Sequence, residues 1–85
     1  MNDQKPRMIG ERVKRARILA KLTLKELSKK TGISYSTLSR IENGRRIINV
    51  IELLKISKLV NKPVTYFFQT GNNLIDYFYP PYYRK

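Results

Sequence analysis

Residues 23–46, TLKELSKKTGISYSTLSRIENGRR, contain two short amphipathic segments separated by one glycine. Thr23 and Glu26 have the S/T-x-x-E spacing of a capping box, which begins a helix. Gly32 is the residue type that ends a helix in the left-handed conformation, and Ser34 can cap the next helix. We therefore predict two helices joined by a tight turn, and the rest of the chain must fold around this pair.

The apolar and small residues between positions 24 and 43 recur where two helices pack across such a turn. They are Leu27, Ser28, Thr31, Ile33, Leu38 and Ile41. This spacing predicts a helix-turn-helix. The second helix would expose small hydroxyls, one tyrosine and one arginine in place of the usual mixture of glutamate and lysine, a face that a merely solvated helix does not need.

Three further helices are expected around this pair. In residues 8–21 apolar side chains recur at helical spacing, whereas residues 1–7 are polar and are expected to fray. The recurring positions are Ile9, Val13, Ala16 and Ala20. The helix that Ser34 begins is expected to end at Asn43-Gly44. Asn49 and Glu52 repeat the capping pattern and begin the next helix.

The inward face of that fourth helix is expected to comprise Val50, Leu53, Leu54, Ile56 and Val60. Pro63 suits the first turn of a short fifth helix that carries Val64, Phe67 and Phe68. No convincing strand precedes residue 70, so the fold is expected to be all-α with five helices.

The composition limits the chemistry of the chain. It has no cysteine and no histidine, which excludes disulfides and removes the commonest transition-metal ligands and general base. Its six carboxylates are scattered along the sequence, so an enzyme is not expected. No stretch is long and apolar enough for a membrane span or a signal peptide, and a cytoplasmic protein is expected.

The formal charge of +12 favours an anionic partner. Nucleic acid and an anionic membrane surface both fit such a charge. The charge alone does not distinguish between them.

The run LTLKELSKKTGISYSTLSRIENGRR, followed by Leu53-Leu54-Lys55-Ile56, resembles the phage-repressor and Cro-like helix-turn-helix family of bacterial and phage regulators. The resemblance covers residues 9–68. It implies a five-helix lambda-repressor-like DNA-binding domain over residues 8–69, followed by a short aromatic-rich C-terminal tail over residues 70–85, with no cofactor or metal.

The resemblance implies that the third helix enters the major groove of double-stranded DNA and contacts bases. The matching positions are Tyr35, Ser36, Ser39 and Arg40. Arg40 is the strongest candidate, because a guanidinium can donate two hydrogen bonds to O6 and N7 of guanine. A phosphate contact or simple exposure remains open for Arg40, as does packing on the domain surface for Tyr35.

The resemblance also implies phosphate contacts at helix N-termini and in the loop after the third helix. The candidates are Thr23, Lys25, Ser34, Asn43 with its backbone N–H, Arg45 and Arg46. Family members often have a glutamine where this chain has Leu24, and Leu24 cannot make that backbone contact. Arg17 and Glu42 match a pair that forms a buried salt bridge in related domains.

The function implied is a transcriptional regulator, most simply a repressor that binds an inverted-repeat operator as a homodimer with half-sites about 34 Å apart. Two alternatives remain open. One is an antitoxin-like or complex-forming protein whose tail binds a protein partner, with DNA binding auxiliary. The other is charge-driven binding to nucleic acid without sequence preference.

The tail is more apolar than a free tail should be. Its candidate contact residues are Leu74, Ile75, Tyr77, Phe78 and Tyr79. Three interpretations remain open for them: packing on the chain's own core, a dimer contact, and a docking segment for another protein.

Overall fold

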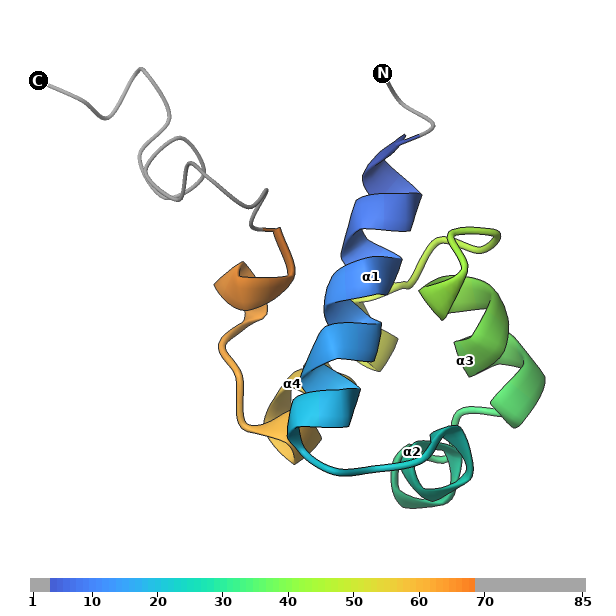
Figure 1. Ribbon diagram of the computed structural model, residues 1–85, viewed down its shortest axis with the longest axis vertical. Coiled ribbons are helices and arrows are strands. Elements are labelled where there is room, and N and C mark those ends of the chain that lie inside the picture. Colours follow the sequence, from blue (N-terminus) through green and yellow to red (C-terminus); the bar gives the residue numbers. More distant parts are fainter. Residues whose placement is uncertain (1–3, 69–85) are drawn as a thin grey trace, which may run out of the picture.

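The computed structural model describes residues 4–68, with side chains from residue 8 onward. This part of the chain contains four α-helices and a final 3-10 helix, and no strand. The elements are α1 (Gln4–Leu19), α2 (Leu24–Thr31), α3 (Tyr35–Glu42), α4 (Val50–Val60) and η1 (Val64–Phe68). In Figure 1, α1 runs through the centre, with α2 and α3 on one side and η1 on the other.

The first helix is longer than predicted. It begins at Gln4 instead of Met8, so the expectation that residues 1–7 fray is wrong for residues 4–7. It ends at Leu19, after which Lys21 adopts a positive φ of 61° to turn the chain toward α2. No helix within residues 4–68 is long and apolar enough to cross a membrane.

The caps of the helix-turn-helix are those predicted from the sequence. Thr23 and Glu26 form the reciprocal capping box, and Gly32 has a left-handed φ of 78°. The Ser34 side chain caps α3 by accepting a hydrogen bond from the backbone N–H of Thr37 at 3.1 Å. Local sequence therefore fixes where both helices begin and where the turn lies.

The turn also satisfies its small polar side chains. The hydroxyl of Thr31 donates to the carbonyl of Leu27 at 2.7 Å and accepts from the backbone N–H of Ile33 at 3.2 Å. The Ser28 hydroxyl donates to the carbonyl of Ile33. These bonds allow Thr31 to be buried without an unpaired polar group, which would cost about 1–3 kcal/mol.

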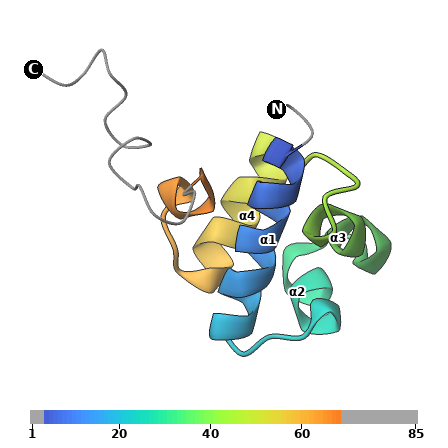
Figure 2. The same ribbon diagram turned by 45° about the horizontal axis from the view of Figure 1, so that its top comes forward.

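The core lies between α1 and the other helices. Leu27, Leu38 and Ile41 contribute the buried face of the helix-turn-helix. They meet Val13 and Ala16 from α1, Leu53, Ile56 and Val60 from α4, and Phe67 from η1. Figure 2 shows α1 and α4 side by side, with α2 and α3 against one side of this pair. The helix-turn-helix is therefore held in place by the whole domain.

The α1–α3 contact brings two backbones very close together. A Cβ added at Gly10 would lie 2.0 Å from the carbonyl oxygen of Ile41. No side chain fits this gap, so Gly10 permits α1 to cross α3 at this distance. Gly10 was not among the residues predicted to pack between helices, although a glycine within a helical pattern is a signal of close packing.

Two predictions about the C-terminal half are wrong. Val50 and Leu54 were expected to face inward, but they are 67% and 48% exposed. The buried side of α4 is formed instead by Leu53, Ile56, Ser57 and Val60. The apolar residues of α4 occupy too wide an arc for periodicity alone to show which side is buried.

The fifth element differs in geometry. Residues Val64–Phe68 form a 3-10 helix rather than an α-helix, so the described chain has four α-helices and not five. The backbone N–H of Tyr66 donates to the carbonyl of Pro63 at 2.9 Å, the i→i+3 bond of such a helix. Phe67 is completely buried, and its insertion into the core holds this short turn in place.

Candidate nucleic-acid interface

The third helix has two chemically distinct sides. Leu38, Ile41 and Glu42 are buried against the domain. On the other side, Ser36 and Arg40 are exposed and Tyr35 is 51% exposed. Ser39 is partly buried beside them; it and these three exposed residues are the positions expected to contact bases.

The N-termini of α2 and α3 both open to solvent. The Thr23 hydroxyl accepts from the N–H of Glu26 at 3.0 Å, and the Glu26 carboxylate accepts from the N–H of Thr23 at 2.8 Å. At α3, the Ser34 hydroxyl also donates to the hydroxyl of Thr37 at 2.8 Å. Each cap satisfies some of the first-turn N–H groups. The positive end of a helix dipole favours an anion, and at α2 the Glu26 carboxylate already lies at that end.

The backbone N–H of Asn43, at the end of α3, is engaged within the helix. The backbone N–H of Asn43 donates to the carbonyl of Ser39 at 3.1 Å. This N–H is therefore already used by the last turn of the helix, whereas the side chain of Asn43 is exposed and stays a predicted phosphate contact. Asn43 also has a φ of −92°, so the positive φ at this helix end belongs to Gly44 alone, at 74°.

The two arginines of this loop have different surroundings. Arg45 is exposed. The Nη1 atom of Arg46 lies 2.9 Å from Oε1 of Glu52 and donates to the carbonyl of Ile47 at 3.3 Å. Arg46 therefore fixes the loop to the start of α4, a contact that the sequence analysis missed because the two residues are six apart and on different elements.

The Glu52 carboxyl is the point where these interactions meet. Its burial would raise its pKa, but hydrogen bonds from Arg46 and the backbone N–H of Asn49 oppose that effect, as do the charges of Arg46 and Lys55. The net result is a pKa below the ordinary value of a glutamate. The carboxylate is thus held ionised at the N-terminus of α4, where it also favours the helix dipole.

Arg17 and Glu42 join α1 to the last residue of α3. Nε of Arg17 donates to Oε2 of Glu42 at 2.8 Å, and Nη2 donates to Oε1 at 3.2 Å. The side chains are only 12% and 4% exposed. Nη1 of Arg17 also donates to the carbonyl of Leu22 at 2.8 Å, so one guanidinium fixes the chain on both sides of the helix-turn-helix.

Helix α2 has one candidate phosphate contact, at Lys25, and lacks the polar side chain expected at position 24. Lys25 is exposed in its first turn. Leu24 is partly buried and packs against the core, so its side chain contributes to packing at the position where a polar contact was expected from the resemblance. The tail residues Leu74 to Tyr79 lie outside the described part of the chain.

No group of three or more potential metal-ligating side chains lies together in the part of the chain that the structure describes. The polar and basic groups on the exposed side of α3, at the two capped N-termini and at Arg45 are donors suited to an extended anion. These groups and the fold define a helix-turn-helix domain.

The chain belongs to the helix-turn-helix family of phage-repressor and Cro type. The sequence pattern of the family, described as "Helix-turn-helix", matches residues 13–67. This match covers all of α2, α3 and α4, so the family pattern extends over the whole helix-turn-helix and the helix that follows it.

Similar proteins bear names of the same kind. The chain is 32% identical over 60 residues to an uncharacterized transcriptional regulator in the ATPase CF(0) region of Rhodospirillum rubrum, covering 71% of this chain and 56% of that protein. It is 28% identical over 72 residues to an uncharacterized helix-turn-helix-type transcriptional regulator of Sinorhizobium medicae, covering 80% of this chain. A regulator of Rhizobium meliloti matches equally well. The chain spans about half the length of these curated relatives.

Proposed function

We propose that this protein is a sequence-specific double-stranded DNA-binding transcriptional regulator, with residues 8–69 as its DNA-binding unit. The observation that carries the proposal is the exposed side of α3, where Arg40, Tyr35 and Ser36 face solvent beside a fully buried opposite side. Membership of the helix-turn-helix family supports the same conclusion. The high positive charge supports an anionic partner.

The proposed mechanism divides the contacts by role. The net positive charge attracts the domain to DNA at a rate that depends on salt. Lys25, Arg45 and the capped N-termini at Thr23 and Ser34 contact phosphates and set the register. Arg40, with Tyr35, Ser36 and Ser39, then contacts base edges in the major groove.

We further propose that the protein acts as a homodimeric repressor at an inverted repeat. A single recognition helix contacts only a few base pairs, and a two-fold dimer doubles the length of the recognised site. Bound at an operator that overlaps a promoter, such a dimer would exclude RNA polymerase. Neither an enzymatic reaction nor a cofactor is needed for this mechanism.

Selection of bound fragments from a random DNA pool tests the proposal. We expect one enriched sequence with two inverted half-sites whose centres lie about one helical turn apart. A single half-site without its repeat would contradict the homodimer. Enrichment of no sequence at about 150 mM salt would contradict sequence-specific binding and favour binding by charge alone.

A further inference from the structure

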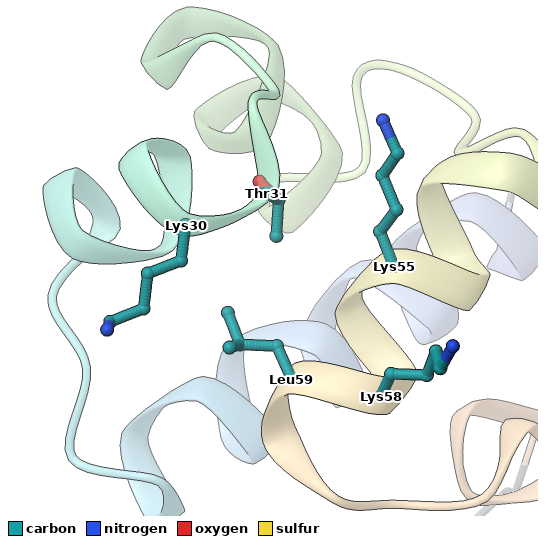
Figure 3. A pocket seen from close by; sticks show the side chains of 5 residues that line it. All are labelled: Lys30, Thr31, Lys55, Lys58 and Leu59. Atoms are coloured by element: carbon teal, nitrogen blue, oxygen red, sulfur yellow. The ribbon is translucent and has the colours of Figure 1, made fainter.

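A second surface of the domain combines lysines with exposed apolar side chains. A pocket of about 380 Å³ between the end of α2 and the second half of α4 is lined by Lys30, Thr31, Lys55, Lys58 and Leu59. Figure 3 shows Leu59 pointing from α4 toward Thr31 at the end of α2, with Lys30 and Lys55 on opposite sides of Thr31. The Lys58 side chain starts from α4 beside them and extends away from α2. We call this surface the α2–α4 groove.

The apolar part of the surface continues along α4. Ile51 is 62% exposed and Leu54 is 48% exposed. They lie one helical turn before Lys55 and Lys58, at spacings of four residues, and therefore on the same side of the helix. The α2–α4 groove thus extends into an apolar strip that nothing covers within the described residues.

The lysines of this surface lack acidic neighbours in direct contact. Lys30, Lys55 and Lys58 form none of the ion pairs found among residues 8–68. The charge of Lys55 does act on Glu52, whose carboxylate is bound by Arg46. The groove therefore presents positive charge that the described part of the protein leaves uncompensated.

The position of the groove separates it from the proposed DNA contacts. Lys30 and Thr31 end α2, whereas Thr23 caps its other end. Seven residues of α-helix correspond to about 10 Å. An exposed leucine and isoleucine also offer nothing to a phosphate backbone, which is contacted by cationic and hydrogen-bonding groups. The apolar strip favours a protein over DNA as the occupant.

The charge also disfavours a second copy of the same chain. The sequence has only six carboxylates against eighteen lysines and arginines. Three of the six, Glu26, Glu42 and Glu52, already bind a cap or an arginine. Two copies meeting through this surface would bring lysines together with few free acids to oppose them, and like charges across an interface are unfavourable.

We propose that the α2–α4 groove binds an acidic amphipathic segment of another protein. Its carboxylates would pair with Lys30, Lys55 and Lys58, and its apolar side chains would cover Ile51, Leu54 and Leu59. An amphipathic helix in a groove is a common form of such recognition. This contact is separate from α3 and would allow a partner to bind the protein while it occupies DNA.

The test uses a synthetic helical peptide with glutamates on one side and leucines at every third or fourth position. It is titrated into the isotopically labelled full chain at about 150 mM salt, where weak surface attraction is screened, and backbone amide signals are followed by NMR. Shifts concentrated at positions 30–31 and 51–59 are expected. A peptide with glutamine in place of glutamate should bind far more weakly, as should one with serine in place of leucine.

Matched variants identify the surface. Lys30→Gln with Lys58→Gln should weaken peptide binding about fivefold, since each exposed ion pair contributes modestly. Lys14→Gln with Arg15→Gln removes the same charge from exposed positions on α1 and should change binding less than about twofold. Lys55 is left intact because its charge acts on Glu52. Thermal melts of both variants establish that each is folded.

Four results would overturn the proposal. The first is equal binding of the glutamate and glutamine peptides, and the second is a set of shifts that maps away from the groove. The third is a loss of affinity for double-stranded DNA in the Lys30/Lys58 variant that exceeds the loss in the Lys14/Arg15 variant, which would make the groove a DNA contact. The fourth is a change in sedimentation mass in Leu54→Ser, which would make a second copy the occupant. If the selection from random DNA enriched no sequence, the proposed role of α3 would fail, and the proposal for the groove would be unaffected.

Discussion

Arg17 binds Glu42 through two hydrogen bonds that join α1 to the end of the proposed recognition helix. Both charged groups are largely removed from solvent. Attraction between two buried charges is roughly offset by the cost of desolvating them, so the pair contributes more to the position of α3 than to net stability. Removing one partner is a different matter, because the other remains buried and unpaired.

Arg17→Ala should lower the free energy of unfolding by about 3–5 kcal/mol, since it leaves the Glu42 carboxylate buried without its partner. Urea denaturation followed by circular dichroism measures the change. Replacing both residues, with Arg17→Met and Glu42→Leu, should cost less than the single substitution. An unchanged melting temperature in Arg17→Ala would show that the pair does not support the fold.

Gly10→Ala should be strongly destabilising. The new Cβ would lie 2.0 Å from the carbonyl oxygen of Ile41, so α1 must move away from α3. Overpacking of this kind costs about 1–3 kcal/mol or more, against a gain of up to about 1 kcal/mol in helix propensity. Lys14→Ala, on an exposed position of the same helix, is the control and should leave the melting temperature nearly unchanged. Equal melting temperatures for Gly10→Ala and wild type would contradict the close helix crossing.

The lowered pKa of Glu52 predicts a loss of stability in acid. The folded state holds the carboxylate ionised, while the unfolded chain takes up a proton at the ordinary pKa of about 4.3. The contribution is therefore complete above that value and disappears as pH falls through the lower folded pKa. Unfolding measured from about pH 6 to pH 3 should depend less steeply on pH in Glu52→Gln than in wild type. Parallel curves for the two proteins would rule out the effect.

Arg40→Ala should reduce discrimination between the selected operator and a single-base variant by about 1–3 kcal/mol at the base that Arg40 contacts. Arg45→Ala should weaken binding to all sequences alike and lower the slope of log affinity against log salt by about one unit. Fluorescence anisotropy with both DNAs at several salt concentrations separates these outcomes. If Arg40→Ala weakened both DNAs equally, Arg40 would be a phosphate contact.

Much of the helix-turn-helix could be predicted from local sequence because its signals are local. The capping box at Thr23, the left-handed Gly32 and the cap at Ser34 each act over three or four residues. The same holds for Asn49 and Glu52 at the start of α4. Hydrogen bonds over such short distances depend little on the rest of the fold.

Other features depended on contacts between distant residues. Val50 and Leu54 were expected in the core, but α1, α2 and η1 cover a different side of α4. The N–H of Asn43 was a candidate phosphate contact, and the last turn of α3 uses it. The Arg46–Glu52 ion pair and the gap at Gly10 likewise appear only when the helices are assembled.

The sequence by itself determined the class of fold, the limits of the two central helices and the polar face of α3, because capping and periodicity are properties of neighbouring residues. Only the tertiary structure decided which side of α4 is buried, how closely α1 approaches α3, and that three lysines from two helices line one groove. These features arise from packing between segments far apart in the chain. Whether an apolar residue is buried or exposed depends on which distant segment packs against it.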